Sequence, residues 1–148
     1  MIRKWTAKSL DPVLTLWLES TTFAHPFIDE QYWHDSLALV RDVYLPAAQT
    51  WVWEENDTLL GFVSVMDNQF VGALFVAPQA LHRGIGSALL NEVKQRYPML
   101  SLEVYQKNGR AVSFYHALGF RIEDGAWQEE TKHPTWIMRW QADQTPLA

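Results

Sequence analysis

A glycine-rich segment between a strand and a helix constrains this chain most. Residues 70–76 predict an apolar strand, Pro78 ends it, and residues 83–87 (Arg-Gly-Ile-Gly-Ser) open a helix that continues to about residue 97. Glycine lets a backbone approach a ligand closely, and the first N–H groups of a helix lack internal partners and carry a partial positive charge. The segment therefore predicts an anion site of the kind that binds phosphate, to which Arg83 can add charge.

Two other phosphate-binding patterns fit this segment less well. The Walker pattern is excluded because no Gly-Lys-Ser/Thr is present. The dinucleotide fingerprint needs a third glycine where Leu89 stands, although Glu103, 19 residues after Gly84, could serve as its acidic ribose ligand. That fingerprint usually lies in a parallel β-α-β unit, whereas here an antiparallel meander is expected before the glycines.

Patterns along the chain predict an α+β fold, in which helices flank a mixed central sheet. We expect a strand over 2–7, a helix capped by Asp11 with Pro12 at its first position, and a second helix capped by Asp29 and ended by Pro46. Gly119 is placed to cap the last helix. The remaining strands are expected over 51–53, 59–66, 70–76, 100–105, 120–123 and 135–140, and the remaining helices over 84–97 and 109–118. The order is β-α-α-β-β-β-α-β-α-β-β.

Composition limits the class of protein. With 148 residues and 48% apolar content, we expect one domain over residues 1–148. The net charge of -5 disfavours nucleic acid and anionic membranes as partners. The absence of cysteine excludes disulfides and a cysteinyl acyl-enzyme, and the five histidines lack metal-ligand spacing. No secretory signal or membrane-spanning run is evident, so we expect a cytoplasmic protein.

Two further blocks follow the glycine segment. They are residues 101–108 (Ser-Leu-Glu-Val-Tyr-Gln-Lys-Asn) and residues 111–120 (Ala-Val-Ser-Phe-Tyr-His-Ala-Leu-Gly-Phe). In this order the three motifs resemble the GNAT superfamily of acetyl-CoA-dependent N-acetyltransferases, over nearly the whole chain. Residues 25–28 (His-Pro-Phe-Ile) and 104–108 are most similar to small enterobacterial peptidyl-lysine acetyltransferases. One departure is Leu81, which stands where the family usually has Gln or Arg.

The resemblance implies acetyl-CoA as co-substrate, with no metal. It implies that backbone groups of the strand before Pro78 bind the pantetheine arm, that the glycine segment holds the pyrophosphate, and that Asn108 contacts pantetheine. The residues so implied are Leu74, Phe75, Val76, His82, Arg83, Gly84, Ile85, Gly86, Ser87 and Asn108.

Acetyl transfer to an amine needs a base, an oxyanion site and an acid. The ammonium, with a pKa of about 10.4, must lose a proton before it attacks. Strand alternation separates Glu103 from its apolar neighbours, so Glu103 is the expected base, directly or through water, and His25 is its rival. The resemblance makes Tyr115 the acid that protonates the departing thiolate. A backbone N–H near Val76 would stabilise the oxyanion, and without cysteine we expect direct attack in a ternary complex.

Charge is divided unevenly along the chain. Residues 1–75 contain 4 basic and 10 acidic residues, a net -6, whereas residues 76–148 contain 8 basic and 7 acidic residues, a net +1. Asp29, Glu30 and Asp35, with nearby aromatic residues, predict a site for a cationic amine on a polypeptide. Protein lysine is the first expectation. An N-terminal α-amine, a small amine and a non-catalytic acyl-CoA-binding module are the alternatives, and an aminoacyl-tRNA substrate is disfavoured by the net charge.

Overall fold

Apolar alternation in the middle of the chain produces a mixed sheet in the computed structural model, which describes residues 1–142. The strand order is β1-β2-β3-β4-β5-β7-β6. Neighbouring strands are antiparallel except for the pair β4 and β5, which is parallel. The strands are β1 (Ile2–Lys4), β2 (Gln49–Glu55), β3 (Thr58–Met66), β4 (Phe70–Val76), β5 (Met99–Tyr105), β6 (Arg121–Gln128) and β7 (His133–Gln141).

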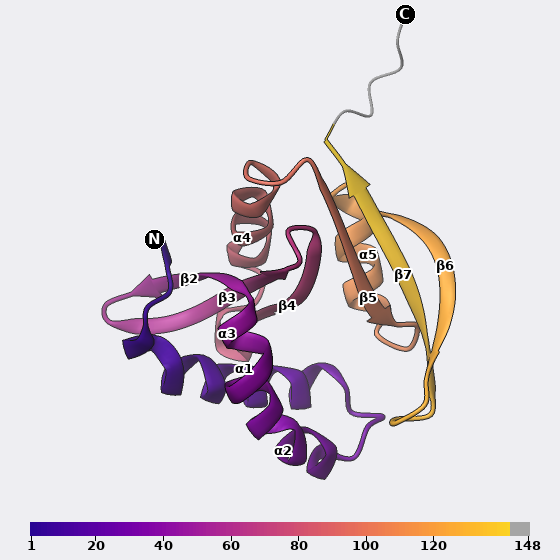
Figure 1. Cartoon of the computed structure of the whole chain (residues 1–148), viewed down its shortest axis with the longest axis horizontal. Helices are drawn as coiled ribbons and strands as arrows, with labels where there is room; N and C mark the ends of the chain where they lie inside the picture. The colour runs from indigo at the N-terminus through magenta and orange to yellow at the C-terminus, as the bar shows by residue number, and fades with distance from the viewer. Residues whose placement is uncertain (143–148) are drawn as a thin grey trace, which may run out of the picture.

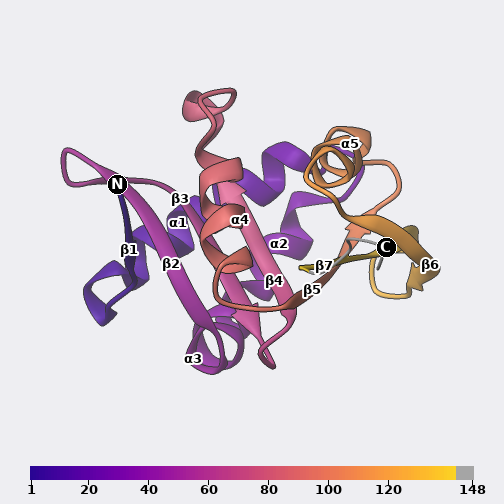
Figure 2. The ribbon, with the colours of Figure 1, turned by 90° about the horizontal axis from the view of Figure 1, so that it is seen from above.

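Helices cover both faces of this sheet. α4 packs against one face of β2, β3 and β4, and α1 packs against the other face of β3 and β4, while α5 lies along β5 (Figures 1 and 2). The helices are α1 (Leu10–Ala24), α2 (Glu30–Leu39), α3 (Leu45–Ala47), α4 (Ile85–Lys94) and α5 (Gly109–Ala117). Apart from the short α3, the elements follow the predicted order.

One apolar core joins the layers. Phe62 of β3, Leu89 of α4, Leu100 of β5 and Met138 of β7 are all fully buried, as is Phe120 after α5. Burying each such side chain contributes about 1.5–3 kcal/mol to the hydrophobic stabilisation. The same core therefore includes residues from β3, on one side of the parallel pair β4 and β5, and from β7, on the other side.

Two predicted helix boundaries were wrong. The first helix begins at Leu10, so Asp11 and Pro12 lie within its first turn and Asp11 is not its cap. Pro46 does not end the second helix, because a π-helical turn over Val40–Tyr44 leads directly into α3. Pro46 thus lies at the start of α3, directly after the π-helical turn.

Two other predicted caps are confirmed. The Asp29 carboxylate accepts a hydrogen bond from the Gln31 N–H at 2.9 Å at the start of α2. Gly119 follows α5 with φ +96°, and a Cβ there would lie 3.1 Å from the Trp140 ring. Glycine at this position therefore meets a conformational and a packing requirement together.

The closing hairpin is longer than predicted. β6 extends from Arg121 to Gln128 and β7 begins at His133, whereas strands were expected only over 120–123 and 135–140. Seven of the eight β6 residues are exposed, so no buried-exposed alternation marks this strand in the sequence. The extension matters because it carries the hairpin turn to the mouth of the cavity described next.

Candidate active site

The central cleft arises where β4 and β5 diverge. Only Phe70 and Ser101 are in register between these strands, and the Ser101 N–H donates to the Gln69 carbonyl at 2.8 Å. Beyond this pair the two strands separate (Figures 1 and 2). A cavity of about 1190 Å³ occupies the opening, larger than the usual range of about 300–1,000 Å³ for small-molecule sites.

A bulge in β4 contributes to the divergence. The β3–β4 register shifts between Ser64 and Val65, which leaves Gly72 as the extra residue in β4. A Cβ on Gly72 would lie 2.8 Å from the Met66 sulfur. A larger residue here would therefore require the Met66 side chain to shift.

Backbone groups of β4 face the cleft at alternate residues. Phe75 is paired with Phe62 of β3, and the next N–H in that series, on Ala77, donates to the Leu60 carbonyl at 2.8 Å. Antiparallel alternation then directs the N–H and carbonyl groups of Leu74 and Val76 away from β3 and toward β5. Leu74 can thus offer its N–H and carbonyl to a ligand and Val76 its N–H, whereas the Val76 carbonyl accepts from the Ser20 hydroxyl at 3.3 Å and the backbone of Phe75 is used by β3.

The glycine segment begins α4 as predicted. His82 and Gly84 both have left-handed backbones, with φ values of +67° and +82°. The first intrahelical bond runs from the Ala88 N–H to the Gly84 carbonyl at 3.0 Å, so the preceding N–H groups have no helical partner. The residues of this segment that line the cavity are His82, Gly84, Ile85, Gly86 and Ser87.

The two glycines of this segment serve different purposes. A Cβ on Gly84 would meet no atom within 4 Å, but the positive φ would strain any other residue. A Cβ on Gly86 would lie 3.3 Å from the Phe114 ring of α5. Gly86 therefore leaves room for the Phe114 side chain, which extends from α5 to the start of α4.

The Arg83 side chain is not on the cavity wall. Its Nη2 atom donates to both carboxylate oxygens of Glu55, the last residue of β2, each at 2.8 Å. Arg83 is absent from the residues that line the cavity, whereas Leu81 lines it. In this structure, the positive character of the helix start therefore comes from backbone N–H groups.

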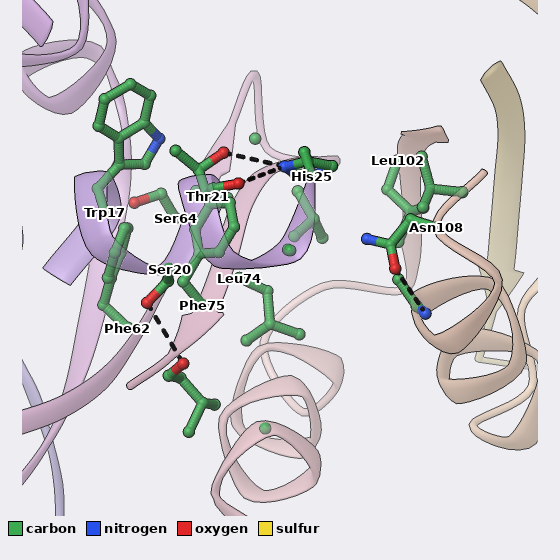
Figure 3. A pocket seen from close by; sticks show the side chains of 18 of the residues that line it. Trp17, Ser20, Thr21, His25, Phe62, Ser64, Leu74, Phe75, Leu102 and Asn108 are labelled. Carbon is green, nitrogen blue, oxygen red and sulfur yellow. Dashed lines mark hydrogen bonds between the residues drawn. The ribbon is translucent and has the colours of Figure 1, made fainter. Parts of the chain in front are cut away.

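Asn108, at the N-cap of α5, and Tyr115, within α5, line the wall of the cavity opposite β4. The Asn108 Oδ1 atom caps this helix by accepting from the Ala111 N–H at 3.3 Å, and its side chain lines the cavity (Figure 3). Tyr115 also lines the cavity, with its ring packed on Phe114 and Phe120. Its hydroxyl has no hydrogen-bond partner among residues 1–142, and burial raises its pKa, so the phenol stays protonated.

Glu103 lies on the β5 wall of the cleft. The predicted alternation is confirmed, because Leu102 and Val104 are buried while Glu103 is half-buried and lines the cavity. Its Oε2 atom accepts a hydrogen bond from the Thr135 hydroxyl of β7 at 2.6 Å. This contact orients the carboxylate, and a carboxylate so placed can attract a cation or accept a proton.

His25 lines the same cavity at the end of α1. Only 8% of its surface is exposed, and its Nδ1 atom lies 2.7 Å from the Thr21 carbonyl oxygen (Figure 3). Its ring contacts those of Phe27, Trp33 and Tyr105, with centroids 5.2–5.8 Å apart. Burial lowers the pKa of His25, so its neutral form is favoured.

The prediction of acidic residues at the amine site is only partly confirmed. Asp29 caps α2 and neither it nor Glu30 lines the cavity, whereas Asp35 does. Two further lining residues were missed, Tyr105 on β5 and Glu130 in the hairpin turn. Strand alternation could have placed Tyr105 on the cavity wall, since it lies two residues after Glu103. No local feature of the sequence predicts that Glu130 lies at the cavity.

The fold and its cleft belong to a known class of enzyme. The family described as acetyltransferase (GNAT) domain matches residues 8–142. The chain therefore belongs to the GNAT acetyltransferase family, and the predicted fold class and enzyme class are confirmed. Dependence on acetyl-CoA follows from membership in this family.

Two curated relatives have similar lengths. Peptidyl-lysine N-acetyltransferase YiaC of Escherichia coli (strain K12) is 59% identical over 145 residues, which cover 98% of this chain and 99% of that protein. Peptidyl-lysine N-acetyltransferase YjaB of the same strain is 30% identical over 122 residues, covering 82% of each chain. The resemblance to peptidyl-lysine acetyltransferases is thereby confirmed.

Solved structures show the same fold. The solution structure of apo-form YjaB from Escherichia coli superposes with a TM-score of 0.81 at 27% identity, covering 95% of this chain and 96% of that chain. The PaiA N-acetyltransferase from Thermoplasma acidophilum, in complex with coenzyme A, gives a TM-score of 0.79 at 22% identity, with coverage of 95% and 98%. At that identity the second likeness shows the fold alone.

The described part of the chain has neither a metal-binding cluster nor a membrane-spanning helix. Residues 1–142 contain no group of three or more His, Asp or Glu side chains that could hold a metal ion. Within the same residues, no helix combines the length and the apolar character needed to cross a membrane.

Proposed function

We propose that this enzyme transfers the acetyl group of acetyl-CoA to the ε-amine of a lysine in a protein or peptide. The observation that carries the proposal is one continuous cavity that joins the start of α4 to a region lined by aromatic and acidic side chains. Relatives named peptidyl-lysine N-acetyltransferases support the same acceptor. We place the reaction in the cytoplasm, where coenzyme A esters are made and used.

Coenzyme A fits the end of the cavity between β4 and α4. The free N–H groups at the start of α4 can receive the pyrophosphate, with the open space at Gly84 admitting its oxygens. The cleft-facing backbone groups of Leu74 and Val76 can bind the pantetheine amides as an added strand would. Asn108 lies across the cleft, where its Nδ2 group, which has no partner among residues 1–142, can donate to the same arm.

The lysine fits the other end of the cavity. Its ammonium is attracted by carboxylates, and aromatic rings can hold its aliphatic stem and its charge. The side chains suited to this task are Tyr32, Trp33, Asp35, Glu103, Tyr105 and Glu130.

The chemistry then proceeds by direct attack, in agreement with the absence of cysteine. Glu103 takes a proton from the ammonium, directly or through water, and the nitrogen attacks the thioester carbon. The Val76 N–H stabilises the oxyanion that forms. When the carbon–sulfur bond breaks, Tyr115 gives its proton to the thiolate, and the second proton on nitrogen is released to give the amide.

Thiol release from acetyl-CoA tests this function. An N-terminally blocked peptide with one lysine is compared with the same peptide carrying norleucine, with a lysine-free peptide bearing a free α-amine, and with a polyamine. Turnover only with the lysine peptide is expected. A preference for the α-amine or the polyamine would identify another acceptor, and acetyl-CoA binding without any turnover would indicate a non-catalytic module.

A further inference from the structure

The hydrogen bonds of His25 define its tautomer. The Thr21 carbonyl oxygen can only accept, and it lies 2.7 Å from Nδ1, so Nδ1 carries the hydrogen. The Thr21 hydroxyl lies 3.2 Å from the same nitrogen. In the neutral ring Nε2 is therefore an unprotonated acceptor.

This acceptor has no partner among residues 1–142. His25 is nine-tenths buried, lines the cavity, and extends from Thr21 toward the gap that separates α1 from Leu102 and Asn108 (Figure 3). Its Nε2 atom is not among the fully buried nitrogen and oxygen atoms that lack a partner in the described residues, so its lone pair is accessible from the cavity. The structure therefore presents an oriented, unsatisfied acceptor to whatever ligand fills this part of the cavity.

The surroundings keep the imidazole neutral. Three aromatic rings enclose it, and no carboxylate is within ion-pair distance among the described residues. Lys107 places its ammonium over the outer neighbour Phe27, at 5.8 Å from the ring centroid, which disfavours a second cation nearby. The titratable groups facing His25 and these rings are Tyr32 and Asp35 of α2, Glu103 and Tyr105 of β5, Lys107 after β5, Glu130 of the hairpin turn and His133 of β7.

We propose that the Nε2 atom of His25 accepts a hydrogen bond from the acceptor amine and positions its nitrogen for attack. The proposal rests on the acceptor site described above. A primary amine has N–H groups to spare, so one can go to His25 while Glu103 takes the proton that must leave. Protonated His25 would present an N–H in place of the lone pair, so kcat/KM falls as pH falls through the pKa of His25.

Two substitutions of His25 distinguish the role of its Nδ1 atom from the role of its Nε2 atom. His25→Asn can keep a donor to the Thr21 carbonyl but has no atom at the Nε2 position, whereas His25→Gln can place its Oε1 acceptor there. We expect His25→Asn to lower kcat/KM for the lysine peptide by about 10²-fold, the loss typical of a misplaced reacting group. His25→Gln should retain most of the activity and lose the part of the acidic decline in kcat/KM that comes from protonation of His25. Acetyl-CoA affinity should be unchanged in both variants, and His34→Gln, an exposed change on α2, is the control.

An observation on the unmodified protein completes the test. With imidazole nitrogens labelled with ¹⁵N, the free enzyme should show the Nδ1–H tautomer of His25, and its Nε2 resonance should shift when coenzyme A and the lysine peptide are both bound. An unmoved resonance, or full activity of His25→Asn, overturns the proposal, and so does equal loss in the Asn and Gln variants with both folded. Failure of the lysine acceptor itself is recognised separately, because the wild-type enzyme would then be inactive on the lysine peptide while acetylating another amine.

Discussion

Replacing Tyr115 with phenylalanine isolates the chemical role of one hydroxyl. Phenylalanine preserves the ring that packs on Phe114 and Phe120. Because no described residue bonds the hydroxyl, its removal should change the free energy of unfolding by no more than about 0.5 kcal/mol. Loss of a positioned acid should lower kcat by about 10²-fold, equivalent to about 2.7 kcal/mol of transition-state stabilisation.

Thiol release at saturating acetyl-CoA and lysine peptide measures this loss, and thermal unfolding measures stability. The matched control is Tyr97→Phe, the same change on a tyrosine that packs against Trp51 and does not line the cavity. Since the protonated phenol is the active form and burial raises its pKa, kcat should not decline through Tyr115 below about pH 10. Turnover of Tyr115→Phe within a few-fold of wild type, or a kcat loss matched by unfolding, would refute the role.

Three further changes test other parts of the cavity. Glu103→Gln should lower kcat for the lysine peptide by about 10²-fold without changing acetyl-CoA affinity, and full turnover would remove Glu103 from the chemistry. Gly84→Val should weaken coenzyme A binding in calorimetry while circular dichroism stays unchanged, because it strains a backbone at φ +82° and fills the open space there; unaltered affinity would place the pyrophosphate elsewhere. Glu130→Lys should raise the peptide KM, whereas Glu129→Lys, outside the cavity, should not. Added salt should reduce this difference, since charges are screened over about 8 Å at physiological ionic strength, and equal KM values would contradict the assignment.

Local patterns predicted the elements that build the cleft. The glycine segment marked the start of α4, and alternation in β5 separated Glu103 from its buried neighbours. Both signals depend on residues within a few positions of each other. Such patterns reflect local backbone conformation and burial, so the predictions made from them agree with the structure.

Features that depend on distant partners were not predictable in this way. Arg83 looks free to meet phosphate in the sequence, but its partner Glu55 lies 28 residues earlier. Glu130 is brought to the cavity by the hairpin in which exposed β6 pairs with β7 from His133 to Arg139. The divergence of β4 from β5 lies beside the bulge at Gly72 and a single registered pair, and neither feature leaves a hydrophobic pattern in the sequence.

The single registered pair between β4 and β5 also governs how the backbone exchanges its amide hydrogens. An interior strand normally has its amides bonded on both sides, yet the cleft-facing amides of Leu74 and Val76 lie in the middle of the sheet with no strand opposite. They should exchange with solvent deuterium as fast as amides at a sheet margin, although Phe75 between them is bonded to β3. A ligand lying along β4 would slow exchange at Leu74 and Val76 and leave Phe75 unchanged, an every-second-residue signature of strand-like binding.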